Sequence, residues 1–263
     1  MKQPDLFTGQ SGRTDAPDVL AALDVDYTPM GLVVQGLLAL QAEVWSSACV
    51  QANLTPRRVL DPSAGSGAWG RGVRAVFGDV RLDAVEVRES EAANLAGTHD
   101  RVVIGDARDF AALTHVRQRR ISYDLVVTNP SFSTAFAASS FWPRMFMDAG
   151  VVCPGGHVAL YGLSQWGQGE EVAPILRACP PVLQIRFGGR PAHRADGQTD
   201  AREYSLWVWR RRLDEPAASS RPSWRTVQLP VLPVALRRWS PSAIPGTYPI
   251  DQALVDEIRS RYL

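Results

Sequence analysis

Cysteine and histidine are scarce in this chain of 263 residues, and neither residue type is clustered. Cys49, Cys153 and Cys179 lie far apart and form no C-x-x-C pair, and the four histidines show no metal-ligand spacing. Disulfide frameworks and structural zinc sites are built from such pairs. We therefore expect neither a disulfide-stabilised fold nor a metal centre.

Long apolar runs and a surplus of one charge are also absent. No apolar stretch approaches the ~20 residues that span a bilayer, and the N-terminal sequence M-K-Q-P-D-L-F leads into polar residues, unlike a signal peptide. These absences favour a soluble, cytoplasmic protein. With 28 basic and 27 acidic side chains the net charge is +1, so a nucleic-acid-binding surface would have to be a local patch.

Core-forming residues, in contrast, are plentiful. Hydrophobic side chains make up 45% of the chain and charged ones 21%, which suits one sizeable α/β domain. We expect a flexible arm over residues 1–17, the folded domain over 18–212 and an extension packed on that domain over 213–263. Prolines in the extension favour extended backbone, and residues 251–262 are predicted to form a closing helix.

The segment over residues 59–70, V-L-D-P-S-A-G-S-G-A-W-G, organises the rest of the chain. It is typical of a strand that ends at Asp61, a tight glycine turn and the start of a helix. In such a turn backbone N–H groups can face a bound anion or nucleoside, and glycine leaves room for close approach. The segment therefore predicts a nucleotide-like ligand at the end of the first strand.

Two further strands are predicted to end beside acidic residues. Residues 80–87 reach Glu86, where a doubly wound fold places the acid that binds ribose hydroxyls. Residues 101–104 are followed by Asp106, whose carboxylate can accept a hydrogen bond from an adenine amino group. Structural roles are the alternative, as a solvated strand end for Glu86 and a helix N-cap for Asp106.

A fourth predicted strand leads into Asn129, Pro130, Ser131 and Phe132, written N-P-S-F. Ligands of open α/β sheets bind outside the carboxyl ends of the strands, where the strand order reverses. If the first and fourth strands flank that point, the glycine turn and N-P-S-F face one crevice.

The remaining segments predict a doubly wound, seven-stranded Rossmann-like sheet. Between its last two strands lies a glycine-rich basic loop, residues 188–197, that could contact a substrate or form a plain hairpin connection. Near the N-terminus, Tyr27-Thr28-Pro29 precedes an apolar helix, for which Thr28 could be the cap and Pro29 the first helical residue.

Taken together, residues 26–210 resemble the class I S-adenosylmethionine (SAM)-dependent methyltransferases, specifically the N6-adenine DNA methyltransferases. Residues 199–209 also look like the end of the phage-type members. The resemblance implies a SAM site in which Asp61 and the glycine loop hold the methionine part, Glu86 the ribose and Asp106 the adenine amino group. The residues that it assigns to the cofactor are Tyr27, Thr28, Pro29, Asp61, Ser63, Ala64, Gly65, Gly67, Glu86, Val87, Asp106, Ala107 and Asn129.

By the same resemblance, N-P-S-F is the catalytic segment. The Asn129 side-chain oxygen and the Pro130 carbonyl would accept hydrogen bonds from the adenine amine and draw its nitrogen toward tetrahedral geometry, while Phe132 stacks on the base. The family has a second proline where Ser131 stands. Serine removes rigidity but no acceptor, so we expect activity to survive this departure.

The implied partner is DNA, and the target adenine must be flipped out of the helix. Trp166, expected to be exposed, or Phe136 would then fill the gap or stack on the base. Arg190, His193 and Arg194 are candidate DNA contacts. Sequence specificity would come from residues 133–140, expected to form a loop, from residues 188–197 or from the C-terminal extension.

The N-terminal arm contains a second candidate interaction site. Its sequence Q-P-D-L-F resembles the peptide that binds bacterial sliding clamps. Leu6 and Phe7 would fill an apolar pocket while Gln3 hydrogen-bonds at the rim. A chance match of such a short motif is the alternative.

Other functions share parts of these patterns. A nicotinamide dehydrogenase would have the glycine turn and the following acid, but would need neither Asp61 nor N-P-S-F. A methyltransferase that acts on RNA or on a protein glutamine shares the whole site, because any planar amino or amide nitrogen fits the same acceptors. A non-catalytic protein of this fold that binds DNA or the clamp is supported only by Ser131.

Overall fold

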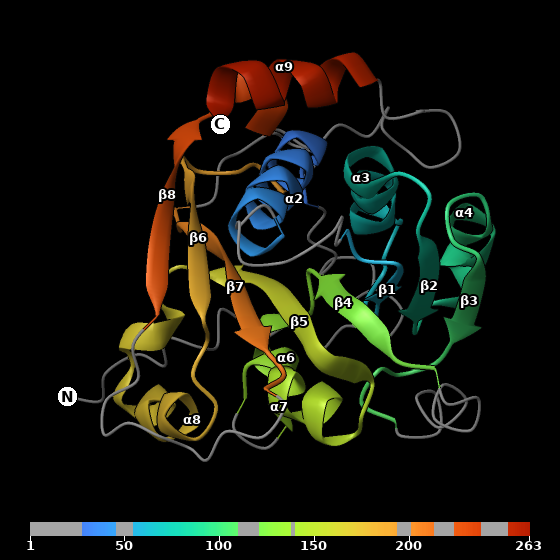
Figure 1. Cartoon of the computed structure of the whole chain (residues 1–263), viewed down its shortest axis with the longest axis vertical. Helices are drawn as coiled ribbons and strands as arrows, with labels where there is room; N and C mark the ends of the chain where they lie inside the picture. Colours follow the sequence, from blue (N-terminus) through green and yellow to red (C-terminus); the bar gives the residue numbers. More distant parts are fainter. Residues whose placement is uncertain are drawn as a thin grey trace, which may run out of the picture.

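The computed structural model describes residues 28–45, 55–109, 121–137, 140–193, 201–212, 224–237 and 252–263. This part of the chain forms one twisted β-sheet with helices on both faces (Figure 1). The strands are β1 (Arg58–Asp61), β2 (Arg81–Glu86), β3 (Arg101–Ile104), β4 (Tyr123–Thr128), β5 (Val152–Leu163), β6 (Leu183–Gly188), β7 (Tyr204–Arg210) and β8 (Arg225–Val231). The α-helices are α2 (Met30–Val44), α3 (Ala68–Phe77), α4 (Ala92–Ala96), α6 (Phe132–Ala135), α7 (Trp142–Asp148), α8 (Ala173–Ala178) and α9 (Gln252–Tyr262). Short 3₁₀ helices are η1 (Glu89–Glu91), η3 (Trp166–Gln168), η4 (Glu170–Val172) and η5 (Val234–Arg237).

The strand order is β3-β2-β1-β4-β5-β7-β6-β8. Neighbouring strands run parallel except for β7, which is antiparallel to both β5 and β6. This topology confirms the doubly wound α/β class. The order reverses between β1 and β4, and the glycine loop and N-P-S-F follow these two strands. The two motifs therefore lie at one edge of the sheet, as the sequence predicts.

The described sheet has eight strands, one more than the sequence predicts. The additional strand, β8, pairs in parallel with β6 and forms one edge of the sheet. Most of its side chains are exposed, and it contains Pro230, so the usual alternation of a strand is missing. An edge strand tolerates proline because its outward-facing backbone positions donate no hydrogen bond to a neighbouring strand. The sequence therefore indicates extended backbone here without indicating strand pairing.

Helix α2 is buried on every side over residues 31–40. It packs between the sheet, α3 and α9 (Figure 1), which explains why its sequence is apolar throughout rather than amphipathic. Two glycines permit this close packing. A Cβ at Gly36 would lie 2.8 Å from the Phe187 ring, and one at Gly72 of α3 would overlap Val33.

The opposite face of the sheet carries an aromatic cluster that includes Phe136, Phe141, Trp166 and Trp209. Trp166 is only 5% exposed, because its ring packs edge-on against Phe136 at a centroid distance of 4.9 Å. The expectation of an exposed Trp166 is therefore wrong. Phe136 is equally buried, so neither ring can replace a flipped base without leaving the core. Part of the loop expected over residues 133–140 is the short helix α6.

Candidate active site

The glycine loop is a tight turn between β1 and α3. Gly65 and Gly67 have φ angles of +53° and +85°, which L side chains rarely adopt. The Gly67 N–H donates to the Ala64 carbonyl at 2.8 Å, and the Ala64 N–H donates to Val85 of β2 at 3.1 Å. These bonds fix the loop against the second strand.

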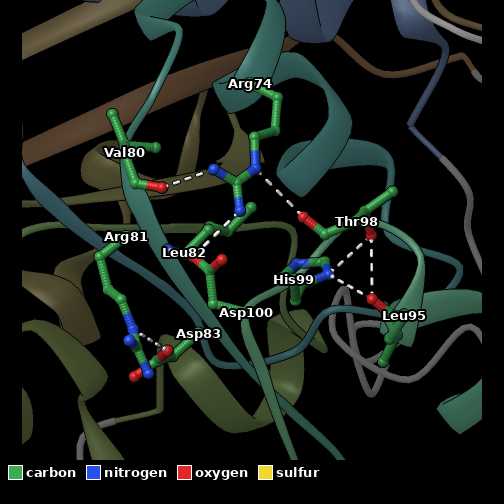
Figure 2. Close-up of polar contacts among 9 residues, drawn as sticks. All are labelled: Arg74, Val80, Arg81, Leu82, Asp83, Leu95, Thr98, His99 and Asp100. Carbon is green, nitrogen blue, oxygen red and sulfur yellow. Dashed lines mark hydrogen bonds and ion pairs between the residues drawn. The ribbon is translucent and has the colours of Figure 1, made fainter.

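The third glycine of the motif has a packing role. A Cβ at Gly70 would overlap the ring of His99, which is buried behind the loop in a polar cluster (Figure 2). His99 Nδ1 lies 2.8 Å from the Thr98 hydroxyl, and the Arg74 guanidinium pairs with Asp100 at 3.0 Å. Burial lowers the pKa of His99 to about 4. The cluster thus anchors α3, and with it the glycine loop, to the strands.

Asp61 ends β1 and has no exposed surface. Neither oxygen of its carboxylate completes a hydrogen bond with the described residues. Burial raises the pKa of Asp61 to about 7; the nearby Thr128 hydroxyl and Ser63 backbone lower the pKa, and the charge of Glu86 raises it. A buried carboxylate without a partner is costly, so the site is suited to a cationic or hydrogen-bond-donating ligand.

Glu86, at the end of β2, is nearly buried and tied to the glycine loop. Its Oε2 accepts the Gly65 N–H at 2.7 Å. Its Oε1 accepts the Arg88 backbone N–H at 3.1 Å and Nε at 2.9 Å, and Arg88 also pairs with Glu91 at 3.4 Å. The carboxylate is therefore held in one orientation beside the loop. Arg88 is a neighbour of the site that the sequence patterns do not single out.

Asp106 follows β3, at the same edge of the sheet. Its carboxylate accepts two hydrogen bonds from Arg108 Nε, at 3.0 and 2.9 Å, and the side-chain hydrogen bond with Arg108 lowers the pKa of Asp106. Ala107 is buried in the core, so only its backbone can contribute to a site. Residues 110–120, whose helix Asp106 is predicted to cap, lie outside the described residues.

An apolar surface lies beside the two acids. Val87 is 67% exposed and Ile104 43% exposed, unusual values for large apolar side chains. Glu86 pairs with Ile104 in the register of β2 and β3, so these side chains border the carboxyl edge of the sheet together. A flat apolar group such as a purine ring could pack against them.

N-P-S-F follows β4 directly. The hydroxyl of Thr128, the last residue of β4, donates to the Ser63 carbonyl at 3.1 Å and so joins the two motifs. Pro130 is buried, Asn129 is half-buried and Ser131 is exposed. Phe132 stacks on Phe136 at a centroid distance of 4.7 Å and an interplanar angle of 20°.

The Thr28-Pro29 segment also reaches the site. The Trp69 Nε1–H, from the first turn of α3, donates to the Thr28 hydroxyl at 3.3 Å. Pro29 precedes the first helical residue, Met30, and Thr28 makes no capping bond, so the predicted cap is wrong. Thr28 is occupied by Trp69 instead. Tyr27 lies outside the described residues.

The candidate DNA and clamp contacts differ in their accessibility. His193 is 4% exposed and packs against Tyr161 and Tyr204, so its side chain is not a DNA contact. Arg190 is exposed, and Arg194 lies outside the described residues, as do the clamp-motif residues Gln3, Leu6 and Phe7.

No family model and no curated protein matches this chain. A solved structure from Listeria monocytogenes, described as a class I SAM-dependent methyltransferase, has a TM-score of 0.50 and 12% identity, and the match covers 89% of this chain and 70% of that one. The chain has a Rossmann-like methyltransferase fold.

Two further structures match with lower TM-scores of 0.47. One, from Pyrococcus horikoshii, is described as an RNA methyltransferase, with 16% identity over 78% of this chain and 95% of that one. The other is the M protein of the type I restriction enzyme EcoKI, with 15% identity over 87% of this chain and 55% of that one.

Among the described residues, no group of three or more His, Cys, Asp or Glu side chains could hold a metal ion. No described helix has the length and apolar character needed to cross a membrane.

Proposed function

We propose that this chain is a SAM-dependent methyltransferase whose acceptor is the N6 amine of adenine in DNA. The observation that carries the proposal is the Asp61 carboxylate, buried and without a hydrogen-bond partner among the described residues, beside the turn at Gly65 and Gly67. A carboxylate in this position needs a donor, and the methionine part of SAM carries a cationic amino group. Pairing the two removes the cost of the buried orphan.

The surrounding residues fit the rest of the cofactor. Glu86 retains acceptor capacity at Oε2, which takes one N–H from the loop, and can meet ribose hydroxyls. Val87 and Ile104 offer an apolar flank for the adenine ring, with Asp106 near its amino group. When bound, SAM supplies a methyl group made electrophilic by its sulfonium.

The acceptor half of the proposal rests on N-P-S-F. An exocyclic amine is a poor nucleophile because its lone pair is delocalised into the ring. The Asn129 side-chain oxygen and the Pro130 carbonyl bind its two hydrogens and orient the lone pair, while Phe132 supports the face of the base. Much of the rate then comes from positioning the two reactants.

DNA is favoured over the other acceptors by the resemblance of N-P-S-F to the adenine methyltransferases. Arg190 and Arg202 are exposed at the two ends of the β6–β7 connection and provide local positive charge in a chain of nearly neutral net charge. Since Trp166 and Phe136 are buried, the base must be flipped without help from either ring.

Incubation of the protein with tritiated SAM and, separately, unmethylated DNA, total RNA and a protein mixture tests the acceptor class. We expect label in DNA. Label in RNA or in protein instead would replace the acceptor proposed here by one of the two alternatives. Cofactor binding without transfer to any substrate would favour the non-catalytic alternative.

A further inference from the structure

The segment over residues 229–237, here called the strap, runs from the end of β8 through η5 and lies against two parts of the domain. One part is the start of α2, where Leu236 contacts Gly31. The other is the β6–β7 loop, residues 189–193, which leaves the sheet at the same edge as N-P-S-F because β6 runs parallel to β5 and β4. The strap therefore connects the start of α2, next to Thr28 and Pro29, with the β6–β7 loop.

Three glycines allow the strap to lie this close. A Cβ at Gly188 would lie 2.7 Å from the Val231 backbone nitrogen, and one at Gly189 would lie 2.7 Å from Arg237 Nη1. A Cβ at Gly31 would overlap the Leu236 carbonyl oxygen. The strap therefore packs directly against the Gly188-Gly189 pair, where β6 ends and the β6–β7 loop begins. This is a role that its sequence, typical of a flexible connection, does not reveal.

Arg237 joins the strap to the loop. Its Nε donates to the Leu232 carbonyl at 2.8 Å, within the strap, and its Nη1 donates to the Arg190 carbonyl at 2.7 Å. The Arg237 carbonyl in turn accepts the Ala192 N–H at 2.9 Å. One residue therefore closes the strap on itself and holds the loop at two points, using the planar donor geometry of a guanidinium.

The loop continues from these bonds to the acceptor side of the site. His193, next to Ala192, shares a hydrogen bond with the Tyr161 hydroxyl at 3.4 Å. Tyr161 follows Leu160, the partner of Thr128 in the last residue pair of β4 and β5, so its backbone lies one position further toward the edge that carries Asn129. Bonded contacts therefore run from Arg237 through the loop to Tyr161, which stands next to the N-P-S-F segment in the strand register.

We propose that Arg237 is a positioning residue that fixes the β6–β7 loop at the edge of the sheet that carries N-P-S-F, so that the strap governs acceptor binding without touching the acceptor. The inference rests on the proposed function, because the loop matters for binding only if an acceptor docks at Asn129. If Arg237 had a purely structural role, its loss would weaken cofactor and acceptor binding together. In the proposed role, its loss weakens acceptor binding and leaves cofactor binding unchanged.

The test compares Arg237→Met and Arg237→Lys with the wild-type chain, using Arg225→Met as a matched control at the start of β8, the strand that leads into the strap. Arg225 pairs with Glu43, away from the loop. We expect Arg237→Met to raise the KM for DNA about 10-fold, the effect of losing charged hydrogen bonds, with the Kd for SAM and kcat within about 2-fold. Arg237→Lys should recover part of the loss, and Arg225→Met should match the wild type.

Hydrogen exchange of peptides covering residues 188–193 gives a readout independent of activity. Exchange should be faster in Arg237→Met than in the wild type or in Arg225→Met. Unchanged exchange and an unchanged KM would overturn the inference, as would equal losses of SAM binding, melting temperature and DNA binding. A wild-type chain that transfers no methyl group would count against the proposed function, and the exchange rates would then still decide whether Arg237 holds the loop.

Discussion

Among single residues, Asp61 is the one whose proposed role in cofactor binding has a cost in stability. Its pKa of about 7, raised from 3.8 by burial, means that the folded protein binds a proton that the unfolded chain releases between these pH values. Stability therefore falls as pH rises from about 4 to about 7 and stays low above it. A cationic ligand that pairs with the carboxylate would offset this loss of stability.

Asp61→Asn should raise the free energy of unfolding of the ligand-free protein by about 3–4 kcal/mol at pH 8 and abolish SAM binding. The amide is neutral at every pH, so the gain should shrink toward pH 4. Thermal melts at several pH values and calorimetric titration with SAM measure both effects. A variant that binds SAM like the wild type would contradict the role given to Asp61.

Two histidines have the opposite pH dependence. Burial lowers the pKa values of His99 and His157 to about 4, so the stability gained from their neutral forms is complete above pH 6.5 and is lost as pH falls toward 4. In this window the unfolded chain holds up to two more protons at the histidines than the folded protein does, and the folded protein holds one more at Asp61. We predict a net loss of about 1.4 kcal/mol per pH unit of acidification, and about twice that slope in Asp61→Asn. Urea unfolding at pH 4.5, 5.5 and 6.5 measures these slopes. Equal slopes in the two proteins would contradict the assignment.

Ser131→Pro tests the departure of N-P-S-F from the family signature. The φ angle of Ser131 is −55°, within the range of a proline ring, so the substitution requires little backbone change. We expect kcat to be unchanged or raised and stability to rise by about 0.4–1 kcal/mol. A loss of activity without loss of SAM binding would show that the Ser131 side chain takes part in the reaction.

Among helices and strands, β5 lies in close contact with the C-terminal end of α6, which belongs to the proposed acceptor segment. A Cβ at Gly162 of β5 would lie 2.7 Å from the Phe136 ring, on which Phe132 stacks. Gly162→Ala should therefore cost about 1–3 kcal/mol of stability and raise the KM for DNA by displacing Phe132. Gly97→Ala, where the nearest atom is 3.8 Å away, is the control and should be neutral in both assays. Wild-type behaviour of Gly162→Ala would argue against a role for the stacked pair.

The sequence predicts those elements whose signals are local. The turn at Gly65 and Gly67 follows from residue type, and the alternating order of strands and helices places it opposite N-P-S-F. The burial of Trp166 and His193 could not be read from the sequence, because it depends on elements that are distant along the chain. Strand β8 escapes prediction for the same reason, since only its pairing with β6 makes it a strand.

For the whole molecule, the described C-terminal segments, residues 224–237 and 252–263, pack on the same core as the rest of the domain. Val255 and Ile258 of α9 are fully buried in the core that contains α2, and Leu229 and Leu232 join the same core. At about 1.5–3 kcal/mol for each buried side chain, their removal approaches the whole stability of a typical domain, about 5–15 kcal/mol. A chain that ends at residue 212 should therefore show no cooperative thermal transition.

The double substitution Val255→Ala with Ile258→Ala gives a graded version of the same test. It should lower the free energy of unfolding by several kcal/mol in denaturant titration, roughly 3–6 by the range for large-to-small core substitutions. Arg259→Ala, on the exposed side of α9, should change it by less than about 0.5 kcal/mol. A cooperative transition in the truncated chain would contradict the integral role of this region.

The proposal that this molecule methylates adenine in DNA is decided by nucleoside mass spectrometry of unmethylated DNA incubated with SAM and either the wild-type chain or Asn129→Ala. We predict N6-methyl-2′-deoxyadenosine with the wild type, and at least about 100-fold less with Asn129→Ala, the scale of losing one preorganised polar group. Calorimetry should show that both proteins still bind SAM. A wild-type chain that binds SAM but leaves no N6-methyl-2′-deoxyadenosine in DNA, or an Asn129→Ala variant as active as the wild type, would contradict it.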